Sequence, residues 1–252
     1  MSPLFRRTLF WAILFGAIVG PAGNGAAADG ADPRNADGRS NRMPIALEEA
    51  FLQVIDAPDW ERLATGEIIT RITRQDADTV VAQSMGRIQA PPRACFEVVR
   101  RYDQYTTLMP HTVESKVLRA FALDAPHPGA EAVDFWTRIR VFGFSTGYLL
   151  RIAHLPQPCG ERLDIYWTLV DDPSQTTGCL DADGQPCAND LALNLGAHRF
   201  EPFPGDPDAT LHTYTLTLKG TRWYQRAGLR LGAGHSMADV VGRIREALHC
   251  TE

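Results

Sequence analysis

The chain has 252 residues, of which 44% are hydrophobic and 22% charged, an ordinary composition for a globular protein with a sizeable core. The formal net charge of −5 argues against a general affinity for nucleic acids. Beyond the N-terminal region, no stretch is long and apolar enough to predict a membrane span.

The first 28 residues have the layout of a cleavable secretory signal peptide. Arg6 and Arg7 give a positive start, an uncharged apolar run covers 9–19, and small residues at 26–28 suit a cleavage site. The run has about 11 residues, whereas a spanning helix needs about 20, so an uncleaved membrane anchor is the weaker alternative. We therefore expect segment 1–28 to be removed and the mature protein to work outside the cytoplasm, in the periplasm.

A leader and a short helical extension are expected before the main domain. Residues 29–44 are rich in Asp, Gly, Arg and Asn, which predicts a flexible leader. Apolar residues recur at helical spacing over 47–54, and 59–63 suits one more helical turn. We place the domain, with this extension, at 45–252.

The central part of the chain predicts one helix among many strands. Pro91 and Pro92 suit a helix start, because a proline at the first helical position loses no hydrogen bond. Cys95, Val98 and Tyr102 then fall on one face, and the helix is expected to stop near residue 105. The strand-like segments are 67–73, 79–88, 113–121, 132–142, 147–154, 162–170, 191–200 and 210–219.

The strands alternate in a way that predicts an antiparallel sheet with one wet face. In 132–142, Val133 and Phe135 share one face, while Asp134, Arg138 and Arg140 share the other. The aromatic residues Tyr148, Trp167 and Tyr214 likewise share faces with Leu and Ile neighbours.

The last predicted element is a long amphipathic helix. Ser236 followed by Asp239 resembles a capping box, which predicts that the helix begins there. An apolar stripe must be buried, and the apolar face of the sheet is the expected partner. The stripe consists of Met237, Val240, Val241, Ile244 and Leu248.

The five cysteines predict one disulfide. Export permits disulfides, and Cys179 and Cys187 flank a turn-rich segment that contains Asp183-Gly184. We expect these two to be bonded. Because the count is odd, at least one thiol stays unpaired within the chain. Cys95 suits a small core residue, and the pairing of Cys95, Cys159 and Cys250 is open.

Several short motifs resemble a known superfamily. They are GRIQAPP at 86–92, FEVV at 96–99, YDQY at 102–105 and Met109-Pro110. Together with the element order, they make residues 64–250 similar to the START/polyketide cyclase (SRPBCC) superfamily. The resemblance implies an α+β helix-grip fold, in which a curved antiparallel sheet wraps around a long C-terminal helix. The leader, the N-terminal helix and the Cys179–Cys187 insertion depart from the simple pattern.

The resemblance implies a binding cavity without fixing a function. The superfamily includes lipid and quinone carriers and aromatase/cyclases, and it has no common catalytic set. The leading hypothesis is an exported, non-catalytic binder or carrier of a lipid-like or quinone-like molecule, with transient membrane contact. Pockets for such ligands are mostly apolar. The residues predicted to line the cavity are Phe135, Tyr148, Trp167, His198, Tyr214 and Val241.

Two alternatives stay open. A cyclase or dehydrase would need ionisable side chains that converge inside, and His198, Arg199, Glu201 and Tyr214 are the first candidates. Alternation, however, sends Arg199 and Glu201 to the outer face. An envelope interaction protein with a filled interior would instead show an exposed apolar patch, which we would expect around Trp136.

No catalytic residue, cofactor or metal site is predicted. The sequence contains no nucleotide-binding glycine motif and no closely spaced His or Cys pair of the kind that ligates zinc. Asp181, Asp183 and Asp190 suggest a calcium loop, but residue 192, where an EF-hand needs Glu, is Ala.

Overall fold

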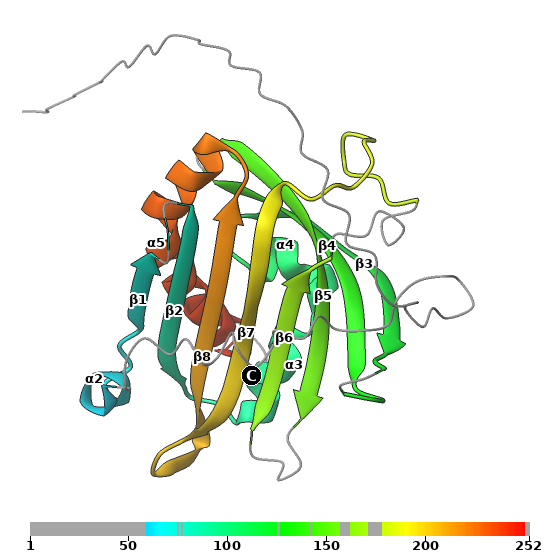
Figure 1. The fold of residues 1–252 in the computed structure, drawn as a ribbon. Coiled ribbons are helices and arrows are strands. Elements are labelled where there is room, and N and C mark those ends of the chain that lie inside the picture. Colours follow the sequence, from blue (N-terminus) through cyan, green and yellow to red (C-terminus); the bar gives the residue numbers. More distant parts are fainter. Residues whose placement is uncertain are drawn as a thin grey trace, which may run out of the picture. The chain divides into compact units, whose positions relative to one another are not determined.

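The protein is an open antiparallel sheet of eight strands with its two longer helices against one face (Figure 1). The structure is a computed structural model that describes residues 59–74, 76, 78–124, 127–141, 143–156, 162–170 and 178–249, without the side chains of 74, 156, 223, 224 and 226–235. The predicted signal peptide, the leader, the helix at 47–54, Cys159 and Cys250 lie outside these residues.

The strands follow the order β1-β2-β8-β7-β6-β5-β4-β3. Every segment predicted as a strand forms one, with ends that differ by a few residues, and the predicted α+β class is confirmed. β3 is an edge strand, and its pairing with β4 shifts register twice. The elements are α2 (Trp60–Ala64), β1 (Ile69–Arg74), β2 (Thr79–Ile88), α3 (Pro92–Val99), η1 (Tyr102–Gln104), α4 (Tyr105–Leu108), β3 (Thr112–Ala122), β4 (Glu131–Val141), β5 (Phe144–Pro156), β6 (Leu163–Leu169), β7 (Leu191–Phe203), β8 (Asp206–Gly220) and α5 (Trp223–His249).

The main core lies between the sheet and the two longer helices. Alternate residues of the strands point inward and meet α3 and α5, as the predicted apolar stripes require. In the described part of the chain, no helix is both long and apolar enough to cross a membrane. The buried members are Ile88, Cys95, Phe96, Val98, Val99, Tyr102, Val133, Phe135, Leu150, Ile152, Leu163, Ile165, Trp167, Phe200, Val240, Val241 and Ile244.

The closest approach of α5 to the sheet occurs at Gly86 in β2. A Cβ atom added at Gly86 would lie 2.7 Å from Cγ1 of Val241, a separation that real contacts do not reach. The missing side chain of Gly86 therefore makes room for Val241, which is fully buried.

Gly86→Ala is expected to lower the free energy of unfolding by about 1–3 kcal/mol, because the added methyl pushes α5 from the sheet. Val241→Ala removes the clashing atom, so the double variant should be more stable than the sum of the two single losses predicts. Urea unfolding of the four proteins measures this coupling. Strictly additive losses would contradict the proposed contact.

The start of the terminal helix differs from the prediction. α5 begins at Trp223, so Ser236 lies inside the helix and is not its N-cap. The actual start is held by Gln225, whose Oε1 accepts hydrogen bonds from the backbone N–H groups of Thr221 and Arg222, both at 3.0 Å. Gln225 therefore acts as the Glu or Gln of a capping box, whose side chain accepts a hydrogen bond from the backbone N–H of the cap residue.

The helix predicted after Pro91 is also shorter than expected. α3 stops at Val99, and a 3-10 turn and α4 follow. At this break Tyr102 turns inward to His154, and the hydroxyl of Tyr105 donates to the carbonyl of Val99 at 2.7 Å. These two bonds fix the irregular path of the backbone.

The outer face of the sheet is not wet at β4 and β5, contrary to the prediction. Asp134 is 1% exposed, and its carboxylate accepts hydrogen bonds from Arg151, at 2.8 Å, and from Arg119, at 3.0 Å. The ring of Phe121 lies beneath both guanidinium groups. Charges on this face are thus buried in pairs, which alternation alone cannot distinguish from solvated charges.

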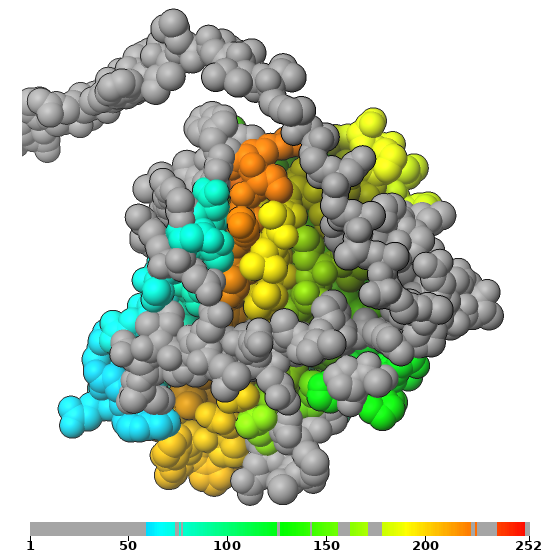
Figure 2. Space-filling model, in the orientation of Figure 1, coloured from blue at the N-terminus to red at the C-terminus, as the bar shows by residue number. Residues whose placement is uncertain are grey.

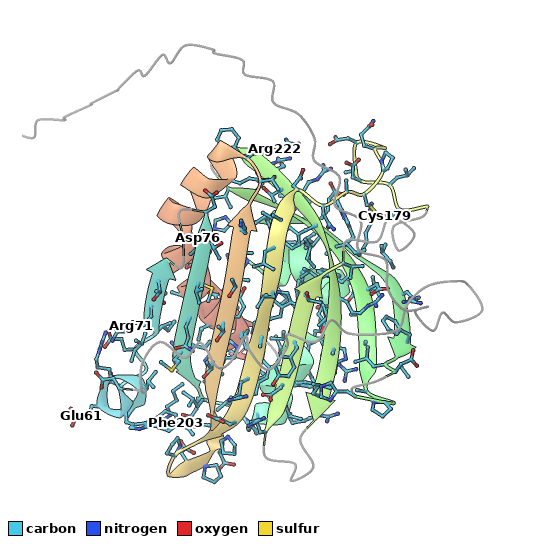
Figure 3. The ribbon with its side chains drawn as sticks, in the orientation of Figure 1. Glu61, Arg71, Asp76, Cys179, Phe203 and Arg222 are labelled. Carbon is cyan, nitrogen blue, oxygen red and sulfur yellow. A yellow bond between two sulfur atoms is a disulfide. The ribbon has the colours of Figure 1, made fainter. Side chains whose placement is uncertain are left out.

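Trp136 does not form the exposed patch that the interaction-protein hypothesis needs. Its side chain is 1% exposed and packs with Leu149 and the two cysteines of the predicted pair. Cys179 and Cys187 form the predicted disulfide, which lies in the loop labelled in Figure 3. Arg138 holds the same loop through Asp181 and Asp183. The insertion therefore covers the outer face of the sheet.

Candidate ligand-binding interior

Three predicted cavity residues form one aromatic stack on the inner face. The ring of His198 lies parallel to that of Tyr214, with centroids 4.5 Å apart. Trp167 contacts both rings, at 5.3 Å from His198 and 5.7 Å from Tyr214. The pairing of His198 with Tyr214 across β7 and β8 produces this contact, because directly paired residues on antiparallel strands share a face.

A second buried histidine adjoins the stack. Nδ1 of His198 lies 2.9 Å from Nε2 of His212, so the two rings share one hydrogen bond. Burial holds the pKa of His198 well below its usual range, with the His212 charge as a second cause, and lowers the pKa of His212 to about 3. Both rings are neutral at ordinary pH, and the pair is a hydrogen-bonding group without charge.

Asn194 adds a polar group beside Trp167. The indole Nε1 donates to Oδ1 of Asn194 at 3.0 Å, and the amide of Asn194 also lies beside the hydroxyl of Tyr148. Burial raises the pKa of Tyr148 to about 12. The interior therefore carries a few convergent polar atoms among apolar walls, which is typical of ligand pockets.

Three tyrosines on the inner face are only partly buried. Burial raises the pKa of Tyr105, Tyr148 and Tyr214. The charge of Tyr148 raises the pKa of Tyr214 further, and the charges of Tyr214 and Tyr148 both raise that of Tyr105. All three side chains nevertheless keep accessible surface, as do Leu169 and Leu216 beside them.

The other end of the interior is closed by a different hydrogen bond. The hydroxyl of Tyr102 lies 2.6 Å from Nε2 of His154, and the rings stack. Burial and the neighbouring Arg100 lower the pKa of His154 to about 4. His154 and Tyr102 are both buried, so this bond packs the core.

The six predicted residues all face the interior, but they do not all meet. Trp167, His198 and Tyr214 contact one another, and Tyr148 lies beside Tyr214. Phe135 packs instead on Tyr102, at 5.4 Å, and on Tyr105, at 5.3 Å. Val241, a residue of α5, packs against Gly86 of β2. Their role as ligand contacts stays a prediction.

Sequence reasoning missed several inner residues. Asn194 and His212 stand at even spacing from His198 and Tyr214, so strand alternation could have placed both inside. His154 stands at even spacing from Tyr148 in β5, so alternation could have placed it inside as well. Tyr105 gave no such signal, because it follows a helix break. Cys95 is buried, as predicted, and its thiol is free; burial raises its pKa to about 11.

Arg199 and Glu201 were candidates for the enzyme hypothesis. Arg199 points to the outer face, where its Nε donates to Asp164 at 3.1 Å. Its neighbour Phe200 faces the core, so Glu201 shares the outward side of the strand with Arg199. Among the residues that the structure describes, no cluster of three His, Cys, Asp or Glu side chains is arranged to hold a metal ion.

Comparison with known proteins identifies the type of fold of this chain. No protein-family model matches the sequence, and no curated protein matches it. Human StAR-related lipid transfer protein 5 is similar in structure, with a TM-score of 0.56 and 11% identity over 82% of this chain and 94% of the other. The lipid transfer and protein localization domain of human StarD13 has a TM-score of 0.52 and 15% identity over 72% and 84%. A STAR-related lipid transfer protein from Xanthomonas axonopodis has a TM-score of 0.50 and 12% identity over 71% and 98%. The chain therefore has a START-like fold.

Proposed function

We propose that the protein binds and carries a hydrophobic small molecule, lipid-like or quinone-like, in the interior between α5 and the sheet. One observation carries the proposal: Tyr105, Tyr148 and Tyr214 pack against the inner core yet are only partly buried. Three proteins of known structure with this fold are named for lipid transfer, which supports a ligand of this class.

Native mass spectrometry of protein purified from its own envelope, followed by lipid extraction, tests the proposal. We expect one reproducible bound species. Leu216→Trp should displace it, because the indole would occupy the space beside Tyr214. Ala192→Trp adds the same group at an exposed position of β7 and should keep the species. A protein that is empty by this measurement, and that binds no lipid from vesicles, would overturn the proposal.

The cyclase or dehydrase alternative is less favoured by the electrostatics. A general base works best when its pKa lies near the operating pH. The inner candidates His198 and His212 have pKa values far below neutrality because both rings are buried. We therefore assign the pair to hydrogen bonding with a ligand oxygen rather than to proton transfer.

We also propose that the protein is exported and works in the periplasm after loss of segment 1–28. The supporting features are the charged start, the apolar run and the small residues of that segment. The Cys179–Cys187 disulfide adds support, because such bonds persist mainly in oxidising compartments. N-terminal sequencing of the mature protein should begin at Asp29. A cytoplasmic, uncleaved protein would contradict this proposal.

A further inference from the structure

A separate pocket lies at the C-terminal end of α5, on the α2 side of the sheet. Its volume is about 200 Å³, and it is open to solvent on one side. The walls come from the end of α2 with the turn after it, from the end of β2 and from the last turns of α5. In Figure 2, α2 (blue) and the β7–β8 hairpin (gold) protrude at this same end of the molecule. Six of the lining residues are Ala64, Arg87, Ile88, Gln89, Arg245 and Leu248.

The α2 wall is fixed by its own contacts. Leu63 is fully buried and packs with Phe203 and Leu211, while Trp60 lies edge-on to Phe203 at 6.0 Å. Figure 3 labels Phe203 beside the hairpin and Glu61 on α2. Arg87 also donates to the carbonyl of Ala64 at 3.2 Å. The pocket therefore has a rigid rim.

The two arginines in the walls differ in their partners. Arg87 forms an ion pair with Asp206 at 2.5 Å, which offsets its charge. Arg245 donates Nε and one Nη to the carbonyl of Arg87, at 3.1 and 2.6 Å. Burial lowers the pKa of Arg245, and no carboxylate of the described residues forms an ion pair with it.

A half-buried cation without an anionic partner attracts an anion. The carbonyl end of α5 contributes partial negative charge here, about half an elementary charge, which the full charge of Arg245 exceeds. The wall is apolar at Ala64 and Leu248 and polar at Thr65, Gln89 and His249. The site therefore combines the charge of Arg245 with a wall that is only partly apolar.

We propose that this pocket binds the carboxylate of a small amphipathic acid, with Arg245 as its cationic partner and the apolar body against Leu248 and Ala64. The site is distinct from the interior that the proposed function uses, because neither the stacked aromatic residues nor the three tyrosines line it. A molecule of about ten non-hydrogen atoms or fewer suits its volume.

Calorimetric titration with hexanoate, and with hexan-1-ol as its neutral match, tests the proposal. Hexanoate should bind saturably and the alcohol at least tenfold more weakly. Arg245→Met keeps an unbranched, flexible side chain but removes the guanidinium and its charge, and should weaken hexanoate binding at least tenfold. Arg243→Met is the matched control, because Arg243 is an exposed residue of the same helix that pairs with Glu246.

Ala64→Leu gives a second test if Arg245→Met fails to fold, because it fills the pocket from an exposed position without changing any charge. It should abolish hexanoate binding. Equal binding of hexanoate to the wild type and to Arg245→Met would overturn the proposal. Loss of binding in Leu216→Trp, with Arg245→Met unaffected, would place the acid in the interior instead. That outcome would support the carrier proposal while refuting this one.

Discussion

Lowering the pH from 7 to 5 is expected to reduce the free energy of unfolding by about 5 kcal/mol. His154, His198 and His212 are all buried, and their pKa values in the folded protein lie below the ordinary value of 6.5. In the unfolded chain these rings regain ordinary pKa values and take up protons as the pH falls below about 6.5. The unfolded state is then favoured by about 2 kcal/mol for each ring at pH 5.

The free energy of unfolding falls at low pH because only the unfolded chain takes up these protons. Above pH 6.5 neither state binds these protons, so the three rings add no pH dependence. Between that value and about 4, the folded pKa of His154, only the unfolded chain binds them, so stability is lost. Arg245 beside His212 and Arg100 beside His154 deepen the effect, because each disfavours a second positive charge.

Urea unfolding at pH 5, 6 and 7 measures the loss. His154→Gln keeps a polar partner for Tyr102, and it should remove about one third of the pH dependence. His111→Asn is the control, because His111 is exposed, and Asn tolerates its positive φ of 63°. Equal stability at pH 5 and pH 7 would show that the three rings are not buried as neutral groups.

Gly196→Ala is expected to destabilise the protein by about 3 kcal/mol or more. A Cβ atom at this position would lie 2.3 Å from Cζ2 of Trp167 and 2.4 Å from the backbone carbonyl oxygen of Thr215. The indole thus packs directly on the backbone of β7, and the carbonyl of a central strand cannot move aside cheaply. The added methyl would displace Trp167 from His198 and Tyr214.

Gly242→Ala provides a matched control, because a Cβ at this position of α5 meets no atom within 4 Å. Alanine is the better helix former, so this variant should gain about 0.5–1 kcal/mol. Thermal unfolding with near-ultraviolet circular dichroism measures both changes and reports the environment of the tryptophans. A neutral Gly196→Ala would show that the indole does not cover the strand.

The sheet could be predicted because its strands carry their own signals. Each combines β-branched or aromatic residues with alternation, and turn residues separate them. The predicted start of the terminal helix was wrong, because Ser236 is a residue type that suits a cap but lies inside the helix. The helix begins thirteen residues earlier, at Trp223, where Gln225 caps it. Composition shows which residues suit a cap, whereas the first unpaired backbone N–H groups decide where one forms.

The residues on the inner face of the sheet could be predicted from the sequence, whereas the burial of residues on its outer face could not. Alternation places His198 and Tyr214 on one side of the sheet, and their contact follows from strand pairing. Whether Asp134 faces water or Arg151 depends on residues far away in the chain, which no local pattern records. For the same reason Trp136 could be assigned to the outer face but not to burial under the disulfide loop.

The two edges of the sheet determine how the protein avoids associating with itself. A terminal strand offers unpaired backbone groups to any other extended chain, which is the first step of fibre growth. Among the described strands, β1 and β3 are terminal. β1 has only 6 residues, with the exposed Arg71 among them. The two register shifts of β3, with Glu114, Lys116 and Arg119 along it, break the regular pattern that a copy would need. The register shifts of β3 therefore hinder the addition of a further strand at this edge of the sheet.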